Sequence, residues 1–93
     1  MTLEQEARRG EQARRLLEDP LLQEAFAIVD DGLRAAWAAT AEDASSERER
    51  LWLMIRLLDR VRGHIADVLA TGRMAGAQLA EISARAPSHR QED

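Results

Sequence analysis

The residues of this 93-residue chain that could take part in chemistry are a histidine inside a predicted helix and two pairs of adjacent carboxylates. His64 follows Arg60 by four residues and precedes Asp67 by three, so these side chains share one side of a helix. A zinc site needs three or four ligands, and the other histidine, His89, lies in a polar C-terminal stretch. We therefore expect no metal site.

The paired carboxylates are Asp30 with Asp31 and Glu42 with Asp43. Two neighbouring carboxylates can act as general acid and base where their surroundings separate their pKa values. No apolar shelter, no Ser/His/Asp arrangement and no glycine-rich phosphate loop accompanies these pairs. We expect solvated charge rather than catalysis, and the sequence predicts no enzyme, no catalytic residues and no cofactor.

Two stripes of residues, spaced alternately by three and four positions, point to helix packing instead. The first is Leu22, Phe26, Val29, Leu33, Ala36 and Thr40, and the second is Leu51, Met54, Leu58, Val61, Ile65, Val68 and Gly72. Such spacing is typical of helices that pack along a coiled-coil-like seam. Since a short polar stretch joins the stripes, we predict an all-α fold, an antiparallel helical hairpin of two long helices with an extra short N-terminal helix. A chain this short buries a modest share of its surface, so we expect it to oligomerise with copies of itself.

Three sequence signals mark the expected helix starts. They are a capping box at Thr2 and Gln5, the pair Asp19-Pro20, and a second capping box at Ser46 and Glu49. We predict helices over about 3–18, 20–40 and 47–84 in a single helical domain of residues 1–86. Gly72 could end the third helix or be passed over, and we favour a continued or kinked helix. Pro87 ends any helix, and we expect residues 87–93 to form a flexible polar tail.

The stretch from Leu51 to Leu58 is apolar on nearly every side of its predicted helix. One partner helix covers only about 100° of a helix surface, so this stretch needs more than one neighbour. Either the N-terminal helix covers the extra face or another subunit does, and we expect a subunit interface anchored by Trp52. The expected interface residues are Leu51, Trp52, Met54, Ile55, Leu58, Val61, Ile65, Phe26 and Trp37.

The net charge of the chain also limits the kinds of partner that it can bind. The chain carries 17 acidic residues against 13 basic ones, a net charge of −4, which argues against wholesale binding to nucleic acid or to an anionic membrane. The candidates for phosphate contacts are Arg56, Arg60 and Arg62, which do not share a single helical stripe. A solvated face or salt bridges between subunits is the usual meaning of such a pattern. No apolar run is long enough for a membrane span, and no cysteine is present.

Beyond these patterns, the order of helix caps and apolar residues resembles a known class of proteins. The residues that carry the resemblance are Asp19-Pro20-Leu21-Leu22, Glu24-Ala25-Phe26, Trp37, Thr40, Arg48-Glu49-Arg50-Leu51, Gly72, Met74-Ala75 and Gln78-Leu79. Over about residues 8–80, the chain resembles small helical proteins encoded near the head and packaging genes of tailed bacteriophages, prophages and gene-transfer-agent-like elements. The resemblance implies a protein that is cytoplasmic in a bacterial host or virion-associated.

The expected architecture is also similar to the oligomerisation core of phage small terminase subunits. In that family, antiparallel helical hairpins pack side by side into rings that present DNA to the packaging motor and contact the large subunit. This sequence lacks the N-terminal helix-turn-helix domain of the family, so DNA contact would be weak or indirect. The resemblance implies an oligomeric assembly or DNA-packaging factor with a phage packaging or head protein as partner. The alternative is a helical adaptor or inhibitor that binds one host or phage protein through the apolar patch around Trp52.

Overall fold

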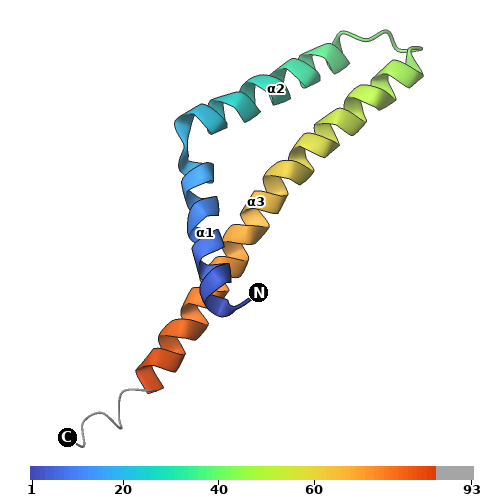
Figure 1. Ribbon diagram of the computed structural model, residues 1–93. Helices are drawn as coiled ribbons and strands as arrows, with labels where there is room; N and C mark the ends of the chain where they lie inside the picture. Colours follow the sequence, from blue (N-terminus) through green and yellow to red (C-terminus); the bar gives the residue numbers. More distant parts are fainter. Residues whose placement is uncertain (86–93) are drawn as a thin grey trace, which may run out of the picture. The chain divides into compact units, whose positions relative to one another are not determined.

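The computed structural model describes residues 1–85, and its three helices confirm the prediction that the chain is all-α. Helix α1 spans Leu3–Glu18, α2 spans Pro20–Ala38 and α3 spans Ser45–Arg85 (Figure 1). Helix α3 has 41 residues and runs through Gly72 without a break. The expected flexible tail of residues 87–93, with His89, lies outside the described residues.

The first two helices begin with side-chain caps. The Thr2 amide donates to Gln5 Oε1 at 2.9 Å, and the Gln5 amide donates to Thr2 Oγ1 at 3.2 Å, which is the reciprocal pattern of a capping box. Asp19 caps α2, because its Oδ1 accepts from the Leu22 amide at 3.0 Å. Pro20 occupies the first turn, where its missing amide hydrogen leaves no partner unsatisfied.

The predicted capping box at the start of the third helix does not form. Helix α3 already includes Ser45 and Ser46, and the Arg48 amide donates to the Ala44 carbonyl at 3.0 Å. An N-cap residue needs a non-helical backbone, so Ser46 cannot serve as one. No hydrogen bond joins Ser46 to Glu49 in the described part of the chain, and the prediction of that cap was wrong.

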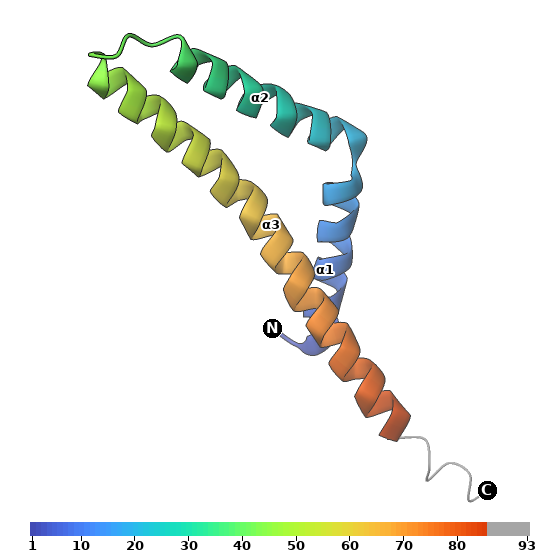
Figure 2. The same cartoon turned by 180° about the vertical axis from the view of Figure 1, so that it is seen from behind.

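Contacts within the chain group into two units. The first unit combines Met1–Arg15 with the chain from Ala66 onward. Here α1 lies against the second half of α3 with backbone touching backbone (Figure 2). A Cβ built on Gly72 would lie 2.4 Å from the Gly10 Cα, and Ala13 and Ala75 are buried beside this contact. Only residues without a larger side chain allow helices to approach this closely.

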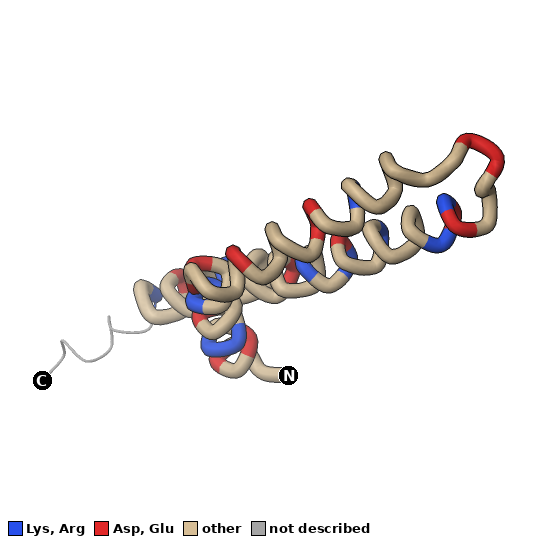
Figure 3. The backbone as a smooth tube through the Cα atoms, turned by 90° about the horizontal axis from the view of Figure 1, so that it is seen from above, with Lys and Arg blue, Asp and Glu red and all other residues tan. Residues whose placement is uncertain are grey.

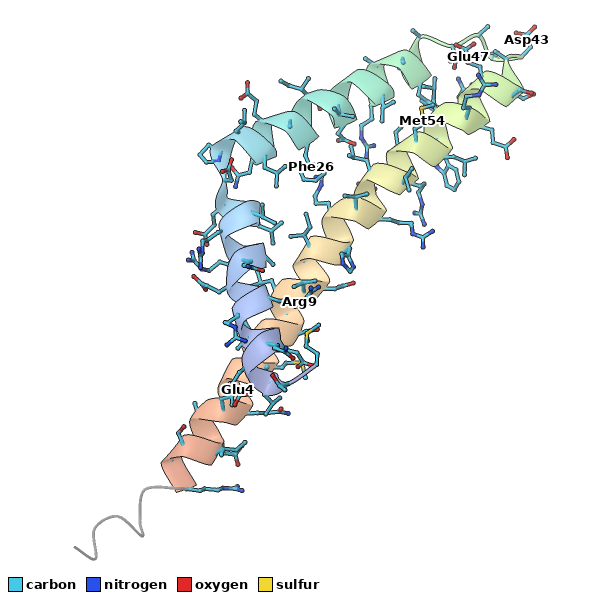
Figure 4. The ribbon with its side chains drawn as sticks, viewed as in Figure 1. Glu4, Arg9, Phe26, Asp43, Glu47 and Met54 are labelled. Carbon is cyan, nitrogen blue, oxygen red and sulfur yellow. The ribbon has the colours of Figure 1, made fainter. Side chains whose placement is uncertain are left out.

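The second unit is Leu16–Ile65, which contains α2 and the first half of α3. The Arg48 guanidinium lies 4.1 Å from the centre of the Trp37 ring, and the Arg62 guanidinium lies 5.1 Å from that of Phe26. These contacts therefore pair the two helices in reverse order along the chain. Figure 4 shows Phe26 on the side of α2 that is turned toward α3. Ile55 is the buried apolar residue of this unit, and α2 has no buried residue.

Candidate association site

The inward side of α3, meaning the side that faces α2, departs from the predicted seam at two positions. At each of them the next residue along the chain takes the predicted residue's place. Ile55 is 8% exposed and Arg62 is half-buried, whereas the predicted seam residues Met54 and Val61 are 44% and 49% exposed. Leu51, Leu58 and Ile65 are half-buried and belong to both stripes. Met54 and Ile55 are both apolar, so hydrophobicity did not distinguish them, whereas Arg62 is charged and was not expected on the inward side.

Apolar side chains are left largely uncovered by the chain's own fold. Among the described residues, the buried apolar ones are Ala13, Ile55 and Ala75. The exposed large apolar residues are Met1, Leu16, Leu21, Ile28, Val29, Trp37, Trp52, Leu53, Met54, Leu57, Val61, Met74 and Ile82. Single exposed apolar residues are ordinary, but a cluster of them marks an interaction surface.

Three exposed apolar residues of the second unit come directly before a residue that faces the other helix. Met54 precedes the inward Ile55, Leu57 precedes Leu58, and Leu21 precedes Leu22. A helix turns by about 100° per residue. The residue just before an inward-facing one therefore lies on one flank of its helix. Since α2 and α3 are paired in reverse order, the two flanks lie on the same side of the unit. This side, called face A, consists of Leu21, Ala25, Ile28, Val29, Gly32, Ala36, Met54, Leu57 and Val61.

Residues that come directly after an inward-facing residue lie on the side of the unit opposite face A. The lining of one pocket agrees with this geometry. Arg34 follows Leu33, Arg56 follows Ile55 and Asp59 follows Leu58. These residues line a single pocket of about 390 Å³ together with Trp37, Trp52 and Ile55. We call this side face B and define it by Arg34, Trp37, Trp52, Arg56 and Asp59.

Face B combines aromatic rings with arginine side chains. The Arg56 guanidinium lies 5.4 Å from the centre of the Trp52 ring, and Trp52 is 51% exposed. Arg34 Nε donates to both carboxylate oxygens of Asp30 at 3.1 Å, so this arginine is held against its own helix. Tryptophan and arginine are common at protein-binding hot spots, and face B has the composition of a protein-docking site.

A second pocket, of about 200 Å³, is lined by the start of α2 and by Arg62. Leu16, Leu17, Leu22, Gln23, Phe26 and Ala27 form the rest of its lining. Nε and Nη2 of Arg62 are buried without a hydrogen-bond partner in the described chain. The Arg62 guanidinium lies over the Phe26 ring, 5.1 Å from its centre, so the arginine packs against α2 rather than extending into solvent.

The three candidate phosphate-binding arginines lie in different environments. Arg62 is half-buried over Phe26, Arg56 is exposed beside Trp52, and Arg60 is exposed. A groove that follows a nucleic-acid backbone needs several free cations in a row. The structure does not bring these three arginines together in that way. Figure 3 also shows acidic residues at the turn between α2 and α3, where Glu42 and Asp43 follow each other.

The candidate residues for acid–base chemistry are dispersed. Asp30 is paired with Arg34, while Asp31 and His64 are exposed. Within residues 1–85, no three His, Cys, Asp or Glu side chains gather where they could hold a metal ion. Of the helices described, none combines the length and apolar character needed to cross a bilayer.

One carboxylate in the first unit has a perturbed titration. Arg14 Nε donates to both Glu11 oxygens, at 3.1 and 3.0 Å, and Nη2 of the same arginine also contacts Oε1. These hydrogen bonds, together with the nearby positive charges of Arg14 and Arg15, lower the pKa of Glu11. Glu11 is exposed, so the pair is a surface ion pair within α1 rather than a reactive group.

Comparison with known proteins gives no further assignment. No protein-family model, no curated protein sequence and no solved structure matches this chain.

The sequence missed part of the candidate site. Of the expected interface residues, Trp37, Trp52, Met54 and Val61 are exposed, Leu51, Leu58, Ile65 and Phe26 are half-buried, and Ile55 is buried within the chain. Leu21, Ile28 and Leu57 are exposed residues that had not been singled out. A signal for Leu21 and Ile28 was present in a second stripe on α2, offset by one position from the first, which runs through Leu21, Ala25, Ile28, Gly32 and Ala35.

Proposed function

We propose that this chain is a non-enzymatic helical protein that works by self-association. In this proposal, α2 and α3 form an antiparallel helical hairpin with α1 as an extra N-terminal helix, and copies of the hairpin cover each other's exposed apolar residues. The observation that carries the proposal is the near absence of a core, since Ile55 alone is buried among the apolar residues of the second unit. A chain that cannot bury its apolar surface alone gains stability by burying it against a partner.

The phage resemblance gives this assembly its most concrete form. We propose an oligomeric head-assembly or DNA-packaging factor, similar to the ring-forming core of small terminase subunits, whose protein partner belongs to the same packaging or head apparatus. Its contact with DNA would be weak or indirect, because the net charge is −4 and Arg62 is half-buried. Such a protein acts in the bacterial cytoplasm or in the virion.

A second candidate function is supported by face B. Trp37 and Trp52 line one pocket with Arg34, Arg56 and Asp59, an aromatic and charged mixture that suits a different protein as partner. Under this alternative the chain is an adaptor or inhibitor. Trp52→Ala would then abolish capture of the partner while leaving the mass of the purified chain unchanged.

The test is the absolute mass of the purified chain, measured by light scattering behind a sizing column over a range of concentrations. A mass of eight or more chains supports the ring. A mass of two or four chains supports self-association and overturns the ring. A single-chain mass at every concentration overturns self-association and leaves the adaptor as the function to pursue.

A further inference from the structure

We infer that α2 is a strap, a helix that opens from the first half of α3 and closes again while α3 stays helical. A cluster of Trp37, Thr40 and Arg48, called the latch, holds the strap closed at the C-terminal end of α2. The inference concerns contacts within the second unit alone, and it does not depend on self-association.

Helix α2 differs from the other two helices in how little it buries. Gly10 and Ala13 are buried in α1, and Ile55 and Ala75 are buried in α3, whereas no residue of α2 is buried. In proteins, most of the stability of a helix comes from packing of its apolar face. Helix α2 receives little of that support, so it should unfold when it leaves α3.

Hollows along the junction of α2 and α3 weaken their contact further. One pocket of about 390 Å³ is lined by Trp37 of α2 together with Trp52 and Asp59 of α3. Another pocket, of about 200 Å³, is lined by the start of α2 and by Arg62. Side chains beside a hollow lose part of the attraction that close packing provides. Separation of the two helices therefore breaks fewer contacts than a closely packed junction would have.

The latch joins the end of α2 to the first turn of α3. Arg48 Nη1 donates to Thr40 Oγ1 at 2.8 Å, and the Thr40 hydroxyl donates to the Trp37 carbonyl at 2.6 Å. The Arg48 guanidinium also lies 4.1 Å from the centre of the Trp37 ring, and tryptophan is the ring that attracts a cation most strongly. A second contact of this kind, from Arg62 to Phe26, is longer at 5.1 Å. Arg48 thus holds both a side chain and, through Thr40, the backbone of α2.

The positive charge of Arg48 is directed to α2 although carboxylates are close to it along the chain. These are Glu42 and Asp43 in the turn and Glu47 and Glu49 on α3, all of them exposed. Within residues 1–85, no ion pair joins Arg48 to a carboxylate. Arg48 itself is half-buried, so its contacts with Trp37 and Thr40 are the ones that opening of α2 would break.

The segments on either side of α2 allow it to move. Residues 39–44, which join it to α3, and Asp19, which joins it to α1, lie outside the helices. A few residues outside helices are enough to absorb such a change of backbone. Gln23 Nε2 donates to the Leu17 carbonyl at 2.7 Å, which is a contact with α1 and does not hold α2 on α3.

Opening of the strap changes which apolar side chains of α3 contact water. In the closed form Ile55 is 8% exposed, and Leu51 and Leu58 are half-buried. Loss of α2 uncovers this side of α3. Contacts of α1 with α3 belong to the first unit, so they do not have to break. Elements with few buried apolar contacts commonly open in this local way, and the second unit thereby has a closed and an open form.

The first experiment compares hydrogen exchange in α2 with exchange in residues 49–65 of α3, by mass spectrometry of peptides from the intact chain. We expect protection factors in α2 to be roughly tenfold or more below those of residues 49–65, because α2 opens while α3 stays helical. Equal protection of the two segments would mean that they unfold together, and it would overturn the inference.

The second experiment tests the latch with a matched pair of substitutions. Arg48→Met removes the contacts with Trp37 and Thr40, whereas Arg50→Met makes the same change at an exposed arginine two positions further along α3. Arginine and methionine are similar helix formers. We expect Arg48→Met to lower the protection of α2 by roughly tenfold, because a cation–π contact and a charged hydrogen bond are lost. Residues 49–65 should keep their protection, and Arg50→Met should leave both segments unchanged.

A pair of substitutions at Thr40 tests the hydrogen bond separately from the ring contact. Thr40→Val removes the hydroxyl that accepts from Arg48, and Thr40→Ser keeps it. We expect a severalfold loss of protection in α2 for Thr40→Val and a smaller loss for Thr40→Ser. If Arg48→Met and Arg50→Met have equal effects, or if Arg48→Met lowers the protection of α2 and of residues 49–65 alike, the inference is overturned.

Discussion

The two units of this chain bury their helices in opposite ways. In the first unit, α1 touches α3 through glycine and alanine, and the backbones at Gly10 and Gly72 are in contact. In the second unit, α2 lies along α3 with large side chains, yet it has no buried residue. The comparison teaches that apolar content does not predict burial, since the unit with larger apolar side chains leaves more of them exposed. Close contact depends on complementary shape, which the glycine and alanine surfaces of the first unit provide.

The largest expected effect comes from adding one methyl group at the closest contact. In Gly72→Ala the new Cβ would lie 2.4 Å from the Gly10 Cα and 2.9 Å from the Glu6 carbonyl oxygen, which are both backbone atoms. We expect a loss of about 1–3 kcal/mol in the free energy of unfolding, measured by urea denaturation, and faster hydrogen exchange in α1.

The matched control for this substitution is Gly76→Ala, four residues further along α3. A Cβ at Gly76 would meet no atom within 4 Å, so the variant should gain about 0.5–1 kcal/mol from reduced backbone entropy. If both variants changed stability in the same direction, the close contact between α1 and α3 would be refuted.

A smaller loss of stability is expected from removing the N-cap of α2 in the second unit. Because α2 buries none of its residues within the chain, its formation depends strongly on its N-cap. Asp19→Ala removes the acceptor for the Leu22 amide and should lower stability by about 1 kcal/mol, with hydrogen exchange accelerated in the first turn of α2. Asp19→Asn keeps an acceptor and should lose far less. Equal losses in the two variants would mean that the cap hydrogen bond is not the cause.

The smallest effect is a pH dependence within α1. Hydrogen bonds from Arg14 lower the pKa of Glu11, so the ionised carboxylate stabilises the fold above the ordinary pKa of glutamate. This contribution is lost as the pH falls through the lowered pKa. In Arg14→Gln the pKa of Glu11 should rise toward its ordinary value, as followed by an NMR titration of the side-chain carboxyl carbon. An unchanged midpoint would contradict the assignment of the shift to Arg14.

Local signals in the sequence predicted more of this structure than long-range ones did. The caps at Thr2 and Asp19 form as expected, because each depends on residues only three positions apart. The inward register of α3 was missed because Met54 and Ile55 are both apolar, and only the neighbouring helix distinguishes them. Arg62 occupies a position on the side of α3 that faces α2. A hydrophobic pattern does not place a charged residue there.

The contact between α1 and α3 could not be predicted for a different reason. In the sequence, Gly72 had been interpreted only as a point where the third helix could end, continue or kink. A glycine has no side chain that would indicate a partner, so its pairing with Gly10 is visible only in three dimensions. The candidate site was partly predicted, since Met54 and Val61 are on face A, but its α2 half was overlooked.

The separation of Gly10 and Gly72 in the sequence also has a consequence for the order of folding. Joining α2 to α3 closes a loop of a few residues, whereas joining α1 to the second half of α3 closes one of about 60 residues and loses more chain entropy. On the ribosome, α1 emerges first but must wait for residues near the C-terminal end before it can dock. Contacts between α2 and the first half of α3 can therefore form before the N-terminal helix docks.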